Sequence, residues 1–112
     1  MTQLTQAPGA PAVADDDLAV LGARFGDAIQ PQRTVDGIPT AWVPAARLRE
    51  VLGFLRDDRR HALLFDLSAV DERQREHREG QPPSDFTVFY HLISLARDAD
   101  VRIKVPLRGA YP

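Results

Sequence analysis

The apolar positions in two segments of the chain repeat at the three- and four-residue spacing of an amphipathic helix. The repeat occurs first directly after the acidic run 15–17, and again, most clearly, over 44–57. Acidic residues favour the positive end of a helix, so we expect the run 15–17 to cap the first helix and Gly26 to end it. The alternative for this acidic run, a cation site, would need further oxygen ligands. Pro44 suits the first turn of the second helix, in which Gly53 costs about 1 kcal/mol relative to alanine.

Residues 33–43 predict a pair of extended segments between the two helices. Asp36-Gly37 is typical of a type I′ hairpin turn, in which both central residues need positive φ. Pro39 has no amide hydrogen and must therefore lie at an edge or a bulge. We expect Trp42 to cover the core or a sheet face, and a functional aromatic side chain is the alternative.

Three further strands are predicted in the second half of the chain. Segment 61–70 is a near-continuous apolar run, which predicts a strand covered on both faces. Segment 86–95 carries apolar side chains on both faces, and 101–107 alternates between apolar and polar positions. The short turn 97–100 predicts that the last two strands pair antiparallel. A run of strands with two helices indicates an α+β fold, with two helices packed on one face of a mixed, mostly antiparallel sheet of about five strands.

The composition fits one small domain and excludes several classes of site. The chain has 112 residues, of which 44% are apolar and 27% charged, with 14 Lys and Arg against 16 Asp and Glu and no Cys. A net charge of −2 gives no basic footprint for nucleic acid. The absence of Cys excludes disulfides, thiolate metal sites and cysteine-ligated iron–sulfur clusters. We expect residues 1–14 to be a disordered lead-in and 15–107 to form a single α+β domain.

Two polar residues interrupt the predicted strands. Asp66 lies inside an apolar run, where a carboxylate must be hydrogen-bonded or paired. His91 lies between Phe89 and Ile93 on one strand face, where histidine is more often a packing residue than a ligand or base. We expect Asp66 and His91 to be structural polar anchors, and a small enzyme that uses either residue is an alternative. The common phosphate-binding, zinc-protease and serine-hydrolase motifs do not occur in the sequence.

Two segments of the chain carry a resemblance to a known family. They are Asp66–Asp71, DLSAVD, and Tyr90–Leu95, YHLISL, the second followed by IKV at 103–105. With the helix before them, they resemble the C subunit of the proton-pumping NADH:quinone oxidoreductase, respiratory complex I. The loop 71–85 before DFTVFYHL is most similar to the form in which the C and D subunits are fused in one polypeptide. The resemblance spans roughly 18–107.

The sequence departs from the family in one place. A segment resembling WYEREVxDxFGI, which the family carries downstream of these strands, does not occur in it. On this resemblance, the chain is expected to be the amino-terminal domain of a longer protein, with 108–112 as the start of its next segment.

The resemblance implies a non-catalytic structural and assembly role in the peripheral arm, on the cytoplasmic side of the bacterial inner membrane. No cofactor is then bound by this chain, and FMN, iron–sulfur clusters and quinone belong to the rest of the complex. The implied partners are the D-subunit portion and the iron–sulfur subunits, without nucleic acid or membrane insertion. The candidate contact residues are charged groups on the last strand and in the loop 71–85, for which simple solvation is the alternative. They are Arg102, Lys104, Asp71, Arg73 and His77. A second possible function is a free-standing α+β interaction module unrelated to respiration.

Overall fold

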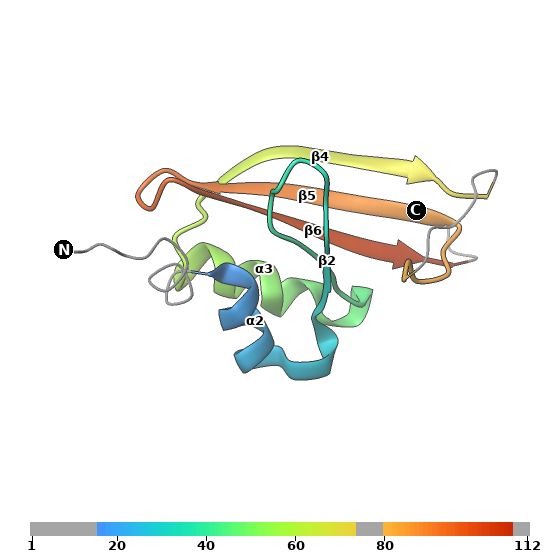
Figure 1. Cartoon of the computed structure of the whole chain (residues 1–112), viewed down its shortest axis with the longest axis horizontal. Coiled ribbons are helices and arrows are strands. Elements are labelled where there is room, and N and C mark those ends of the chain that lie inside the picture. The colour runs from blue at the N-terminus through green and yellow to red at the C-terminus, as the bar shows by residue number, and fades with distance from the viewer. Residues whose placement is uncertain (1–15, 74–79, 109–112) are drawn as a thin grey trace.

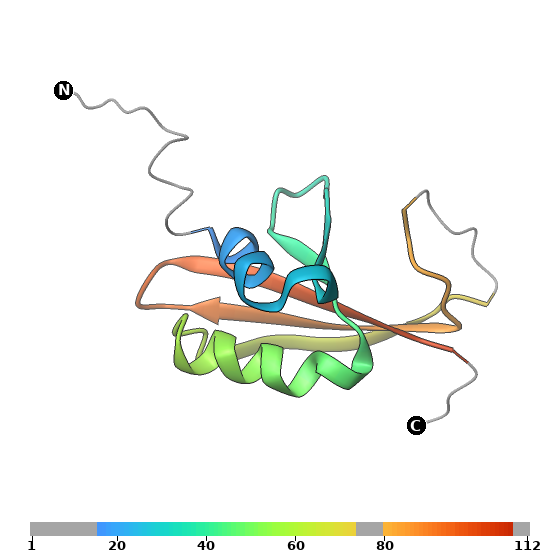
Figure 2. The same ribbon diagram turned by 90° about the horizontal axis from the view of Figure 1, so that it is seen from below.

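A computed structural model describes residues 16–73 and 80–108. Two helices cover one face of a five-stranded sheet, so the molecule has two layers (Figure 1), and the view from below shows both helices in front of the strands (Figure 2). The elements in chain order are α2 (Asp17–Phe25), the 3₁₀ helix η1 (Gly26–Ala28), β2 (Gln30–Gln32), β3 (Thr40–Trp42), the 3₁₀ helix η2 (Ala45–Arg47), α3 (Leu48–Asp57), β4 (Leu63–Asp71), β5 (Phe86–Ser94) and β6 (Ala99–Leu107). The predicted α+β class and the one-sided helix layer are confirmed.

The sheet has the strand order β2-β3-β6-β5-β4. The pair β3–β6 is parallel, whereas β2–β3, β6–β5 and β5–β4 are antiparallel. The sheet is therefore mixed and mostly antiparallel, as predicted, and β2 and β4 form its two edges.

The core lies between the helices and the inner strands. It contains buried apolar side chains from α2, α3, β3, β5 and β6 and from the segments next to them, and the predicted helix spacing accounts for three of them. Its buried members are Leu21, Ile29, Ala41, Val43, Val51, Leu55, Leu92, Val101 and Ile103. Because β6 alternates, Val101, Ile103 and Val105 face this core while Arg102 and Lys104 lie on the opposite face, as predicted.

β2 and β3 form the predicted antiparallel pair on either side of Asp36-Gly37, but the predicted tight turn between them is wrong. Seven residues, 33–39, join β2 to β3, and β2 lies three residues earlier than the predicted strand. Gly37 has a φ of 76°, but Asp36 is not among the described residues with positive φ, so the turn is not type I′. The Asp36 carboxylate instead accepts a hydrogen bond from the Ile38 amide at 3.1 Å. Local side-chain bonding of this kind stabilises a wider loop.

The predicted two-sided cover of segment 61–70 is also wrong. In the structure β4 is an edge strand, and four of its apolar side chains are between 43% and 64% exposed: Leu63, Leu64, Phe65 and Leu67. The described core contains no residue of β4. An apolar run shows that a strand suits burial, but it does not show that the same chain supplies the cover.

Candidate functional site

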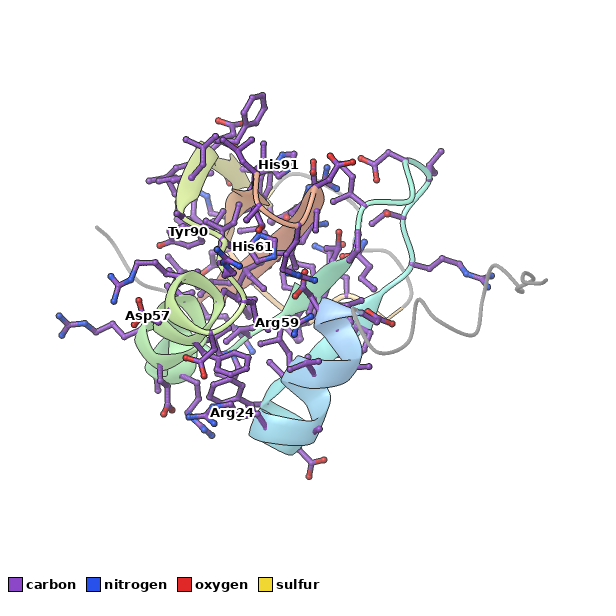
Figure 3. All side chains as sticks on the ribbon, turned by 90° about the vertical axis from the view of Figure 1, so that its left-hand side faces the viewer. Arg24, Asp57, Arg59, His61, Tyr90 and His91 are labelled. Atoms are coloured by element: carbon purple, nitrogen blue, oxygen red, sulfur yellow. The ribbon has the colours of Figure 1, made fainter. Side chains whose placement is uncertain are left out.

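Two residues of the acidic run at the start of α2, Asp16 and Asp17, have different roles. Asp16 is the N-cap, and its Oδ1 accepts a hydrogen bond from the Leu18 amide at 2.9 Å, as the capping prediction required. Asp17 is only 3% exposed and points into the molecule. Arg59 Nε donates to Asp17 Oδ1 at 2.8 Å, and His61 Nε2 lies 2.8 Å from Asp17 Oδ2. Figure 3 shows Arg59 and His61 between the helices and the sheet.

Arg97 completes this buried cluster from the turn between β5 and β6. Its Nη1 donates to Asp17 Oδ1 at 3.2 Å and to the Arg59 carbonyl oxygen at 3.0 Å. Burial alone would raise the pKa of Asp17, but hydrogen bonds from His61 and Arg59 and the charges of His61 and Arg97 outweigh it and lower that pKa. The cluster therefore holds an ionised carboxylate that ties α2 to the segment after α3 and to the β5–β6 turn.

The chemistry of this cluster is structural. Both carboxylate oxygens of Asp17 are occupied by donors, and the side chain is shielded from any substrate. His61 Nδ1 is buried without a hydrogen-bond partner among the described residues. The sequence singled out Asp17 only as part of the capping run and did not connect it with Arg59, His61 or Arg97, because these residues lie 42 to 80 positions away from it. The available signal in the sequence was that these charged residues lie directly beside apolar segments.

The predicted contact residues of β6 lie on the helix-free face of the sheet. Lys104 Nζ lies 5.2 Å from the ring centre of Trp42 and 5.9 Å from that of Phe89, and it donates to Gln32 Oε1 at 3.0 Å. Ammonium groups are attracted to aromatic faces at these distances. Trp42 itself is 4% exposed, so its predicted role as cover for a sheet face is confirmed.

Arg102 lies on the same strand and the same face as Lys104. Its Nη2 donates to Asp36 Oδ2 at 2.8 Å. This hydrogen bond, together with those from the Ile38 amide and the Thr34 side chain, lowers the pKa of Asp36 to about 2. The exposed loop 33–39 is thereby fastened to β6.

The second predicted group lies at the far end of the sheet. Asp71 ends β4, and its carboxylate accepts hydrogen bonds from Arg73 Nε at 2.9 Å and Arg73 Nη2 at 2.7 Å. These bonds and that from the Arg73 amide lower the pKa of Asp71 to about 2. The Arg73 guanidinium also lies 5.0 Å from the Phe86 ring centre. His77 lies outside the described residues.

Asp66 and His91 are brought together as register partners on β4 and β5. His91 Nε2 lies 2.9 Å from Asp100 Oδ2, and its ring packs edge-on against Phe65 with ring centres 5.1 Å apart. Asp66 is exposed on the edge strand, so the burial that the anchor prediction assumed for it is absent. A structural role for either residue stays a prediction.

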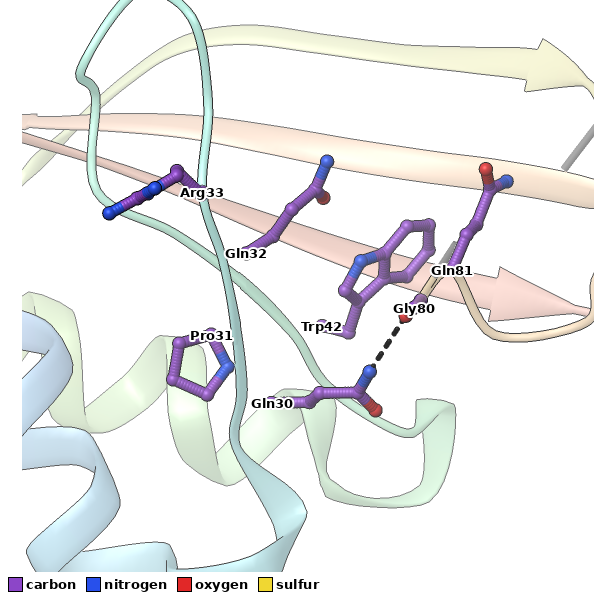
Figure 4. A pocket seen from close by; sticks show the side chains of 7 residues that line it. All are labelled: Gln30, Pro31, Gln32, Arg33, Trp42, Gly80 and Gln81. Carbon is purple, nitrogen blue, oxygen red and sulfur yellow. Dashed lines mark hydrogen bonds between the residues drawn. The ribbon is translucent and has the colours of Figure 1, made fainter. Parts of the chain in front are cut away.

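A cavity of about 300 Å³ lies between β2 and the segment after residue 79. Figure 4 shows its lining, in which Gln30 Nε2 donates to the Gly80 carbonyl oxygen at 2.9 Å beside the Trp42 indole. Of the described residues, those that line it carry amide groups, an indole and the Arg33 guanidinium, and none of them carries a carboxylate or an imidazole. Within 16–73 and 80–108, no three acidic or histidine side chains gather as a metal site. No helix in the same residues has the length and apolar content needed to cross a bilayer.

Comparison with known proteins identifies similar sequences and a similar fold. Residues 41–112 match the sequence pattern of the family described as "Respiratory-chain NADH dehydrogenase, 30 Kd subunit". The C/D subunit of the NADH-quinone oxidoreductase of Acinetobacter baumannii (strain AYE) is 57% identical over 88 residues, which is 78% of this chain and 15% of that protein. The protein of the same name from Psychrobacter cryohalolentis is 64% identical over 77 residues, which is 68% of this chain and 13% of that protein.

The fold also occurs in solved structures. The structure "Nqo5 of the trypsin-resistant fragment (1-134) in P63 form" superposes with a TM-score of 0.68 at 18% identity, covering 80% of this chain and 69% of that one. The chain therefore spans 13–15% of the length of these curated relatives and 69% of the solved fragment.

Proposed function

The chain belongs to the 30 kDa subunit family of respiratory-chain NADH dehydrogenase, and from this we propose that it is a non-catalytic structural and assembly domain of an NADH:quinone oxidoreductase. The observation that carries the proposal is the family match over 41–112, a segment that includes β3, α3, β4, β5 and β6. Since the match includes every long strand, it covers the surfaces by which the domain would contact other subunits. Membership in a respiratory family does not fit the alternative of an unrelated interaction module.

The arrangement of the polar groups supports a role in assembly. The buried cluster around Asp17 joins elements within the chain, and no metal cluster occurs among the described residues. In this proposal NADH oxidation and quinone reduction occur on other subunits, which carry the FMN, the iron–sulfur clusters and the quinone site. This domain keeps those subunits in place within the peripheral arm, on the cytoplasmic side of the inner membrane.

The first proposed partner is the D-subunit portion, because the curated relatives are named as fused C/D subunits. The iron–sulfur subunits are the others. We place the contacts at Arg102 and Lys104 on the helix-free face and at Asp71, Arg73 and His77 near the end of β4. Arg102, Lys104 and Asp71 are already held by Asp36, Gln32 and Arg73. Side chains fixed in advance lose less conformational entropy when a partner binds.

Co-purification tests this function. The gene product that carries this chain is given an affinity tag in its own bacterium and purified in mild detergent. We expect NADH:quinone oxidoreductase activity and the D and iron–sulfur subunits in the same fraction. Recovery of the tagged protein without them contradicts the proposal.

Charge reversal tests the proposed contacts separately. Lys104→Glu is expected to weaken recovery of the partners, while Arg49→Glu, an exposed arginine of α3, serves as the matched control. Equal recovery with both variants would remove Lys104 from the interface and leave the function itself standing.

A further inference from the structure

The two edges of the sheet are built differently. β2 has three residues, and its central Pro31 has no amide hydrogen to offer a further strand. β4 has nine residues, LLFDLSAVD, without Lys or Pro. Natural proteins usually blunt exposed edges with short strands, lysine, proline or a covering element. β2 follows this rule. β4 has a register shift between Leu64 and Asp66 and carries two aspartates, but it is three times as long as β2 and has no proline to interrupt its row of outward-facing backbone donors and acceptors.

The exposed apolar side chains of β4 lie on both faces of that edge. Leu64 and Leu67 are opposite Leu92 and Tyr90, which pack against the core, so these two leucines lie on the helix side. Phe65 packs against His91 on the other side and is 64% exposed. A strand added to β4 would therefore find apolar contacts both above and below the sheet.

A groove of about 680 Å³ continues this surface at the start of β4. Leu63, Ile93 and Leu95 supply apolar lining. The charged lining is Arg56, Asp57 and Arg60, which leaves one net positive charge. Arg56 is bonded to the neighbouring Asp57 at 2.8 and 3.0 Å. Arg60 makes no ion pair or hydrogen bond with the described residues. The groove thus complements an apolar side chain that is accompanied by a carboxylate.

We propose that an extended strand of another subunit of the complex pairs with β4 and places an acidic residue beside Arg60. The proposal rests on the function proposed above and names the surface through which one partner binds. Main-chain hydrogen bonds along β4 supply affinity, and the apolar side chains with Arg60 supply specificity.

The charges favour such a partner over a second copy of the chain. If two β4 strands paired antiparallel about Leu67, Leu63 of one copy would face Asp71 of the other. Asp71 already accepts two hydrogen bonds from the side chain of Arg73. Arg60 would then meet an occupied carboxylate and a second guanidinium, so self-pairing leaves its charge without a counterpart.

Hydrogen exchange in the assembled enzyme tests this pairing. Exchange of β4 amides is measured by mass spectrometry in the 112-residue chain alone and in the purified, tagged NADH:quinone oxidoreductase. We expect β4 amides to exchange at least about tenfold more slowly in the complex, because pairing protects amides that face outward. β2 serves as the reference edge, where no such change is expected.

Substitutions test the same surface. Phe65→Lys combined with Leu67→Lys is expected to lower recovery of the complex by about tenfold or more. Val35→Lys, at a fully exposed apolar position outside β4, is the matched control and should assemble normally. Arg60→Glu should also reduce recovery, unlike Arg49→Glu. Circular dichroism melts of each chain alone confirm that these surface changes leave the fold intact.

The outcomes separate the two proposals. If the unaltered protein purifies without its partners, the proposed function fails and this pairing fails with it. If the complex forms but β4 gains no protection, or if the lysine variants assemble normally, the pairing alone is overturned. A chain that forms dimers in isolation, and loses them in the lysine variants, would show that the occupant is a second copy.

Discussion

Replacing Asp17 by asparagine tests whether the buried cluster is a main source of stability. The side chain keeps its size but loses the charge that faces Arg59, His61 and Arg97. Asp16→Asn is the matched control, since it changes the adjacent residue in the same way. Asparagine caps a helix about as well as aspartate does. The control should therefore be nearly neutral.

The expected loss for Asp17→Asn follows from what remains buried. Removing one partner of a buried ion pair costs about 3–5 kcal/mol, because the other charge is left uncompensated. The side chains of Arg59 and Arg97 keep 16% and 18% exposure, so water offsets part of this, whereas His61 keeps none. We therefore expect a loss of about 3 kcal/mol, at the low end of that range. A small domain has about 5–15 kcal/mol in total, so this is a large share.

The pH dependence of stability gives a second, independent test of the Asp17 cluster. The pKa of Asp17 is lower in the folded chain than its ordinary value of 3.8. A lowered carboxyl pKa stabilises the fold above the unfolded value, and this contribution disappears as the pH falls through the folded value. The difference in stability between the unaltered chain and Asp17→Asn should be full at about pH 6 and shrink as the pH falls below about 4. Carboxyls common to both proteins cancel in that difference.

Urea unfolding followed by circular dichroism measures both effects. The free energy of unfolding is extrapolated to water for the two variants and the unaltered chain, across the acid range. The structural argument fails if Asp17→Asn is as stable as Asp16→Asn. It also fails if the difference between Asp17→Asn and the unaltered chain does not change with pH.

Four further predictions concern single side chains. Carbon NMR should give Asp36 a pKa of about 2, and Arg102→Gln should raise it toward the ordinary value; an unchanged value would mean that Arg102 is not its main partner. Gly53→Ala should stabilise α3 by about 0.5–1 kcal/mol, because nothing lies within 4 Å of the added methyl group. Gly37→Ala should instead destabilise by about 1 kcal/mol, because φ is 76° there, and equal urea midpoints for the two alanine variants would contradict both statements. Asp66→Ala should change stability or assembly but leave the turnover of a complete complex unaltered; a complex of normal composition without quinone reductase activity would refute this.

The local sequence pattern was sufficient to predict the elements that depend on residues close to one another in the chain. The spacing of Leu48, Val51 and Leu55 predicts α3 because these side chains share one helix face whatever surrounds them. The alternation of β6 likewise predicts which side chains face the core. The hairpin was predicted, but its type I′ turn was not found, because the Asp36 side chain bonds to Ile38 and Arg102, and the second of these lies 66 positions away.

For the candidate surfaces too, the local pattern predicted the face of each side chain but not its partners. The alternation places Arg102 and Lys104 on the outward face, but their partners, Asp36, Gln32 and Trp42, come from the other half of the chain. The sequence could not distinguish Asp16 from Asp17, although one caps a helix and the other is buried among Arg59, His61 and Arg97.

By itself, the sequence determined the α+β class, the helices, the core-facing positions of the helices and of β6, and the family, since each depends on neighbouring residues or on a continuous motif. Only the tertiary structure decided that β4 lies at an edge and that Asp17 is enclosed. Those two properties depend on the order of strands in the sheet and on contacts across 42 to 80 positions. The apolar content of a strand indicates that it tends to be buried. The strand order of the sheet decides whether the same chain or another protein covers it.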